Sequence, residues 1–346
     1  MSTEGETQPL GTTTIPSDPT TETPAPKASS PSPTTPTPTP TPTAKTTALA
    51  KLRYLLLRWI SRLANTTDRN LIRLSKLLSS PAATDSLLCT VGYTLTLVHA
   101  VLSKVLERRL ASIATEIASK ANTILLPGET LIATLPAPES TKLLAKTVGS
   151  AKALADTISD FRLFVRMWGL MGLYTWARGT WNAPLAQDAA RKDRVLRGVT
   201  WAQIASCVAF QVLENGAYLS SKGALTSNGW AGDVGKAKET RWWVWSSRFW
   251  AVHVGLEFVR LGVLWVGNDD AKLSEKNDGE KEDKLRMEEK RREKWLWWKD
   301  VVNNAAYFPM TLHWSVEEGI LSSTGVGLCG MIAGGSNLVD FWRNTR

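Results

Sequence analysis

The chain has 346 residues, which is enough for one or two domains with a sizeable core. A hydrophobic fraction of 43% and a mean hydropathy of −0.13 exclude a transporter with many membrane spans. The net charge is +9, and acidic residues outnumber basic ones in the first 50 positions, so the cationic surplus belongs to the rest of the chain. Such a surplus attracts anionic lipid or nucleic acid. Three widely spaced cysteines argue against a disulfide framework and indicate a reducing compartment.

Proline and threonine dominate the beginning of the chain, with a Thr-Pro repeat from Thr35 to Thr43. This composition offers too little apolar surface to offset the entropy of ordering, so we predict a disordered or polyproline II tail over residues 1–48. The tail contains no Arg and no apolar run, which excludes a signal or transit peptide. Two interpretations stay open for it, an inert spacer and a substrate of proline-directed kinases.

Apolar residues recur with a helical period from residue 51 onward, which predicts an all-α fold of membrane-associated amphipathic helices over 51–121. We expect a break at residues 65–68 and a new helix capped by Thr84 or Asp85. Basic amphipathic helices bind anionic membrane surfaces, although a helix packed on its own core shows the same pattern. The predicted membrane-binding residues here are Leu52, Arg53, Leu55, Leu56, Arg58, Trp59, Ile60, Arg62, Leu63, Arg69, Leu71, Arg73, Leu74, Lys76 and Leu78.

Residues 86–103 carry no formal charge, but Thr90, Thr94 and His99 make this stretch a poor membrane span. We therefore predict a buried or interface-lying helix there, followed by a connector over 122–150. A further amphipathic helix is predicted over 154–181. The membrane-binding residues predicted on it are Phe161, Arg162, Arg166 and Trp168.

Two later segments, 198–222 and 319–341, are predicted to be embedded or transmembrane helices, because each contains a long run without charge. The second run is rich in small residues, which allow close helix packing in lipid. The predicted helix-packing residues are Gly325, Gly327, Gly330 and Gly334. Between the two segments, residues 269–300 carry many charges of both signs and are predicted to be exposed to solvent.

Sixteen tryptophans occur in the chain, the first at Trp59, and most stand beside an Arg or Lys. Tryptophan favours places that are apolar at one end and wet at the other, so this pairing is typical of segments at a membrane interface. A soluble helical core that uses Trp is the alternative.

Motifs with catalytic or metal-binding meaning are weak. The pattern G-x-G-x-x-G at 325–330 follows a polar stretch instead of a strand, so we reject a dinucleotide site. The three histidines are scattered and no cysteines have ligand spacing, so we predict no metal and no cofactor. His313 and Glu317 lie one helical turn apart, but such a lone pair is more often structural than catalytic. We predict that the protein is not an enzyme.

The succession of segments resembles the fungal branch of the peroxin-11 family, over about residues 51–346. The resemblance is carried by 65–71, 84–93, 158–162, 213–216 and the glycine-rich ending 325–333. It implies a peroxisomal membrane protein that inserts an amphipathic helix into one leaflet, elongates the membrane, self-associates and works with fission machinery. The many tryptophans and the charged segment depart from the family pattern.

Three alternatives remain. The first is a peroxisomal membrane pore for small metabolites, which has also been proposed for this family. The second is a membrane-bound lipid enzyme that uses His313 with Glu317 or Glu318. The third is a nucleic-acid binder, which we disfavour because the cations lie on apolar helices instead of forming a polar groove with stacking aromatics. We therefore expect anionic membrane lipids, and no nucleic acid, as partners.

Overall fold

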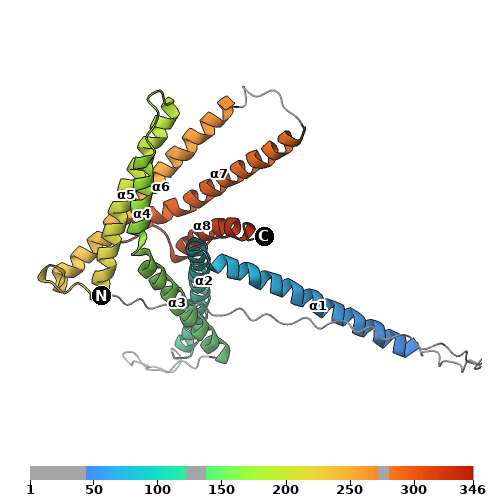
Figure 1. Cartoon of the computed structure of the whole chain (residues 1–346). Helices are drawn as coiled ribbons and strands as arrows, with labels where there is room; N and C mark the ends of the chain where they lie inside the picture. The colour runs from blue at the N-terminus through green and yellow to red at the C-terminus, as the bar shows by residue number, and fades with distance from the viewer. Residues whose placement is uncertain (1–43, 122–137, 272–279, 346) are drawn as a thin grey trace, which may run out of the picture. The chain divides into compact units, whose positions relative to one another are not determined.

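A computed structural model describes residues 44–121, 138–271 and 280–345, and these ranges contain helices and no β-strand. The predicted all-α fold is confirmed (Figure 1). The predicted tail lies outside the described residues up to position 43, whereas positions 44–48 are helical. The helices are α1 (Ala44–Leu78), α2 (Pro81–Ala121), α3 (Glu139–Arg166), α4 (Gly169–Asn182), α5 (Arg191–Ser221), the 3-10 helix η1 (Asn228–Trp230), α6 (Gly232–Ala271), α7 (Glu280–Trp314) and α8 (Ser323–Arg343).

The chain divides into two units after Leu63. The first unit contributes described structure only through the beginning of α1, and the second contains the end of α1 and every other described helix. The predicted break at 65–68 is wrong, because α1 continues through these positions. Asn, Thr and Asp favour helix ends but are tolerated inside a helix, and neither Pro nor Gly stands here to stop it.

The turn between α1 and α2 is set by Pro81. Proline lacks an N–H group and therefore suits the first position of a helix. The carbonyl of Ser80 accepts a hydrogen bond from the backbone N–H of Thr84 at 2.9 Å, and the Thr84 hydroxyl donates to the Leu78 carbonyl at 3.1 Å. Thr84 and Asp85 thus lie inside the first turns of α2, and the predicted cap is one turn too late.

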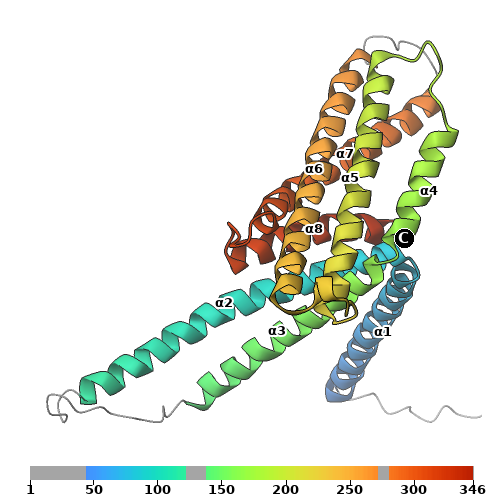
Figure 2. The same ribbon diagram turned by 90° about the vertical axis from the view of Figure 1, so that its left-hand side faces the viewer.

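Within the second unit, most helices pack against one or two neighbours. The order of contacts is α3, α2, α8, α7, α6, α5 and α4, so α8 connects the α2–α3 pair to the α5–α6–α7 group. Figure 2 shows α5 and α6 side by side, with α2 and α3 running next to each other.

The predicted helix over 154–181 is two helices that meet at Met167 and Trp168. The N–H groups of these residues bond to carbonyls three positions back, at 3.1 and 3.4 Å, which tightens the end of α3. The freed Met167 carbonyl accepts a hydrogen bond from the Asn215 side chain on α5 at 3.2 Å. A Cβ atom added at Gly169 would lie 2.6 Å from the Gln211 side chain, so glycine lets α4 begin against α5.

Two other predicted boundaries also shift. The predicted connector 122–150 ends early, because α3 begins at Glu139, and its first part lies outside the described residues. The predicted helix 319–341 begins late, at Ser323, after a turn in which Gly319 has a φ of +67°. The Ser322 side chain caps this helix by accepting a hydrogen bond from the Gly325 N–H at 3.2 Å.

Glycines on one face of α8 bring it against α2. A Cβ atom added at Gly327 would lie 2.8 Å from the backbone N and Cα of Leu97, and one at Gly334 would lie 2.8 Å from the backbone N of Thr90. Between them, Gly330 faces the Tyr93 ring. Gly325 does not take part, since its nearest neighbours belong to the preceding turn. Three of the four predicted glycines therefore form the α2–α8 contact.

We predict that Gly327→Ala destabilises the protein by about 1–3 kcal/mol, because the added methyl group meets a backbone that cannot rotate away. The matched control is Gly335→Ala on the same helix, where nothing lies within 4 Å of an added Cβ. Alanine favours helix more than glycine does, so the control is expected to be neutral or stabilising by up to about 1 kcal/mol. Thermal unfolding of both full-length variants tests this, and equal effects would contradict the contact.

Candidate membrane-interaction surface

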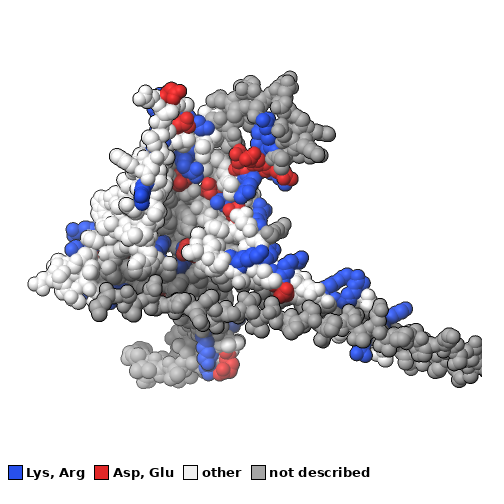
Figure 3. Space-filling view, viewed as in Figure 1, with Lys and Arg blue, Asp and Glu red and all other residues white. Residues whose placement is uncertain are grey.

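The first part of α1 presents an apolar face that no described residue covers. Leu52, Leu55, Leu56, Trp59, Ile60 and Leu63 are spaced three or four positions apart and are each between 47% and 64% exposed. Basic residues border this face, with no acidic residue between positions 44 and 67, and Figure 3 shows Lys and Arg side chains along α1. An exposed apolar face with cationic borders is the arrangement that binds an anionic membrane surface.

In the last turns of α1 the same helix face is covered. Leu77 is 2% exposed and Leu74 is half-buried, whereas Leu71 and Leu78 remain exposed. Sequence periodicity assigned Leu71, Leu74 and Leu78 to membrane binding and missed Leu77, the best buried of them. Its position, one helical turn after Leu74, is the signal that could have identified it.

Arg73 is not free to meet a membrane as predicted. Its guanidinium group donates to the Trp342 carbonyl at 2.6 Å and to the Thr345 hydroxyl at 3.1 Å, and it lies 4.2 Å from the centroid of the Trp342 ring. These contacts fix the end of α1 to the end of α8. The neighbouring cations Arg69 and Lys76 are exposed and form no ion pair with a residue that the structure describes.

Two of the four residues predicted to bind membrane on α3 and at its end pair with acidic residues of neighbouring helices instead. Arg162 makes a two-point contact with Asp85 on α2, at 2.8 and 3.2 Å, and its side chain is 11% exposed. Arg166 lies 3.5 Å from Glu214, a residue of α5 that is 6% exposed. Their cations neutralise acidic groups on neighbouring helices. Phe161 and Trp168, by contrast, are 52% and 67% exposed.

The ion pairs of α3 differ in hydrogen bonding and in exposure to solvent. Glu214 Oε2 and Arg166 Nε are buried and have no hydrogen-bond partner among the described residues. At the surface, Lys222 hydrogen-bonds Asp160 and thereby lowers the pKa of that carboxyl group. Sequence reasoning did not identify Asp85, Glu214 or Asp160 as partners in ion pairs. A charged residue inside an apolar helix usually indicates such a pair.

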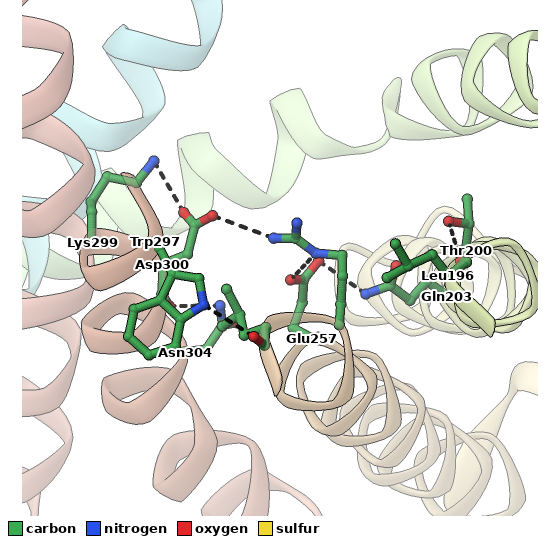
Figure 4. Close-up of polar contacts among 10 residues, drawn as sticks. Leu196, Thr200, Gln203, Glu257, Trp297, Lys299, Asp300 and Asn304 are labelled. Atoms are coloured by element: carbon green, nitrogen blue, oxygen red, sulfur yellow. Dashed lines mark hydrogen bonds and ion pairs between the residues drawn. The ribbon is translucent and has the colours of Figure 1, made fainter. Parts of the chain in front are cut away.

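A second polar network connects α5, α6 and α7 (Figure 4). Gln203 donates to Glu257 at 2.9 Å, and Arg260 donates to Glu257 at 2.7 Å and to Asp300 at 3.3 Å. Lys299 lies 3.2 Å from the other oxygen of Asp300. The two carboxylates and two cations balance, so this network holds three helices together without net charge.

Two helices, α2 over Pro81–Lys120 and α6 over Gly232–Val266, are long and apolar enough to cross a membrane. Only 11% of the most apolar stretch of each is buried within the protein. The core helix of a water-soluble protein would be mostly buried, so this exposure favours association with a membrane. The prediction of one or two such helices is confirmed.

The identity of these helices differs from the prediction. The predicted embedded segments 198–222 and 319–341 belong to α5 and α8. Neither helix has the mean hydropathy of a membrane-spanning helix. Both lack charge over long runs, but α5 buries Gln203, Ser206 and Gln211, and α8 is rich in glycine. The run over 86–103, which we judged a poor span, belongs to α2. The content of Val and Leu therefore predicts a candidate membrane-spanning helix better than the absence of charge does.

The tryptophans divide between surface and helix contacts. Trp59, Trp168 and Trp181 are among the exposed side chains. Trp297, in contrast, packs on Trp265 with ring centroids 4.6 Å apart and donates its N–H to the Leu261 carbonyl at 3.0 Å. Trp250 stacks on Trp314 at 5.8 Å. Exposure fits the predicted interface role for the first group, and Trp265 combines both features, because it is 48% exposed and still contacts α7.

The weak motifs have structural explanations. The G-x-G-x-x-G pattern lies within α8, and its second and third glycines contribute to the contact with α2. His313 accepts backbone hydrogen bonds from Ile320 at 2.9 Å and Leu321 at 3.0 Å, which holds the turn before α8. Among the described residues, no group of three His, Cys, Asp or Glu side chains could hold a metal ion. In the part of the chain that the structure describes, the three cysteines are free.

Comparison with known proteins gives one clear similarity. An uncharacterized protein of Schizosaccharomyces pombe is 26% identical over 185 residues, which are 53% of this chain and 72% of the relative. No protein-family model matches the chain. No solved structure matches it. The resemblance to the peroxin-11 family therefore stays a prediction.

We predict that Arg260→Met destabilises the protein by about 1–3 kcal/mol, because Glu257 would lose its cationic partner in a partly buried network, whereas Asp300 keeps Lys299. The control is Lys142→Met, which removes an exposed ion pair with Glu139 and is expected to change stability by less than about 0.5 kcal/mol. Denaturant unfolding of the full chain measures both. A loss at Arg260 no larger than at Lys142 would show that the network contributes little.

Proposed function

We propose that this protein bends and elongates a membrane by inserting the apolar face of α1 into one leaflet. The observation that carries the proposal is the exposed apolar face over residues 52–63 with its cationic borders. A wedge in the headgroup region expands one leaflet relative to the other, and this needs no covalent chemistry. Each cation near an anionic surface contributes about 1 kcal/mol to binding.

The apolar helices α2 and α6 support the proposal because they offer an anchor. A wedge acts on membrane shape only while it is held at the surface, and a single amphipathic helix binds reversibly. The remaining helices of the second unit then serve to position the anchors. In this proposal the partners are anionic lipids, other copies of the chain and fission machinery.

The proposal also names the organelle in which the protein acts. The resemblance to the peroxin-11 family supports the peroxisomal membrane as the location and peroxisome elongation and fission as the process. The same resemblance supports self-association.

We predict that Trp59→Glu with Leu63→Glu abolishes tubulation of anionic liposomes by the full chain. Two carboxylates on the apolar face add repulsion from anionic lipid and remove apolar burial. The matched control is Ser61→Glu with Asn65→Glu, which adds the same charge at the same spacing on the opposite, exposed face of α1. This control is expected to retain most of the activity. Electron microscopy of the liposomes gives the readout.

Equal loss in the two double variants would contradict the wedge and indicate a general effect of charge. If liposomes containing the wild-type chain pass solutes and do not form tubules, the result would contradict the wedge and support a pore for small metabolites.

We predict that the full chain fused to a fluorescent protein localises to peroxisomes and that its overproduction elongates them and raises their number. The readout is the overlap with a peroxisomal marker and the count per cell. The Trp59→Glu, Leu63→Glu variant should reach the same organelle without changing its shape, because α2 and α6 are intact. Localisation to another membrane would refute the peroxisomal part and leave the wedge intact.

A further inference from the structure

A basic pocket lies where the end of α1 meets the end of α8. Its volume is about 560 Å³. The residues that line it are Asp68, Arg69, Ile72, Arg73, Lys76 and Thr345. Three cations face one carboxylate there, so the pocket has a positive balance. All six residues belong to the second unit of the chain.

The three cations of this pocket form no ion pair with a residue that the structure describes. Arg73 is held by a carbonyl, a hydroxyl and the Trp342 ring, and none of these groups carries a negative charge. Neither Arg69 nor Lys76 forms an ion pair with a described residue. By contrast, the Arg162 and Lys299 side chains, which are 11% and 16% exposed, have acidic partners. The pocket at the end of α1 therefore differs in kind from the internal networks.

Its geometry suits a phosphate group. A guanidinium group has five N–H donors, and described residues use two of those on Arg73, so donors remain on a side chain that is already fixed in place. Arg69 and Lys76 lie four positions before and three after it, which puts the three cations along one side of the helix. Several donors converging on one anion form short, strong hydrogen bonds.

We propose that this pocket binds the phosphate group of an anionic phospholipid headgroup. The proposal rests on the function proposed above, because the pocket lies on the helix that inserts into the membrane. A headgroup held at residues 69–76 would keep the end of α1 at the membrane surface. Ile72 lines the same pocket and adds an apolar contact that a lipid can use and inorganic phosphate cannot.

The test measures binding of a fluorescent short-chain phosphatidylinositol 4-phosphate to the detergent-solubilised full chain. Arg69→Gln with Lys76→Gln is expected to weaken binding by at least roughly tenfold. The matched control is Arg191→Gln with Arg194→Gln, which removes two exposed cations at the beginning of α5, outside the pocket, and should change the affinity by less than about twofold. Equal weakening by both pairs, or no binding by the wild type, would overturn the proposal.

Inorganic phosphate distinguishes the source of the anion. Displacement of the lipid only at a large excess of phosphate is expected, whereas displacement at equal concentrations would assign the pocket to free phosphate and overturn the lipid. The Trp59→Glu, Leu63→Glu variant separates this site from the wedge, because it should lose tubulation and keep headgroup affinity. If the wild type fails to tubulate liposomes, the headgroup affinity can still be interpreted, because it is measured in a separate assay.

Discussion

The close contact between α8 and α2 is the constraint on which the arrangement of the second unit depends. Gly327, Gly330 and Gly334 leave no room for a side chain against α2. Through this contact α8 joins the α2–α3 pair to the α7–α6–α5 series. Any side chain at Gly327 would push α8 away from α2, and with it the end of α8 that holds Arg73.

Ion pairs also join neighbouring helices of the second unit. Asp85 of α2 pairs with Arg162 of α3, and Glu214 of α5 pairs with Arg166 of α3. A polar network joins α5, α6 and α7. Removing a charge from water is costly unless a partner is near, so these cations are committed to internal roles. The cations of α1 between residues 51 and 76 form no ion pair with a described residue, and in the proposed function they face the membrane surface.

The features that favour a membrane belong to different helices. The helices α2 and α6 have the length and hydropathy for a span and are poorly buried within the protein. The beginning of α1 offers a shallow apolar face, suited to the headgroup region instead of the hydrocarbon core. A protein that combines both can hold a wedge in place and keep its effect on one leaflet. The polar networks beside α6 allow such a helix to carry Glu257 and Arg260 at low energetic cost.

The helical class, the amphipathic face of the first part of α1 and most of the glycine face of α8 could be predicted from the sequence, because each follows from local periodicity. The remaining features depend on contacts between helices. Arg162 and Arg166 read as surface cations until α2 and α5 brought carboxylates to them. The division at Met167 depends on Asn215 from another helix. Residues far along the chain decide whether a charged side chain faces water, lipid or an acidic partner. Periodicity depends only on residues close in sequence, so it cannot predict these contacts.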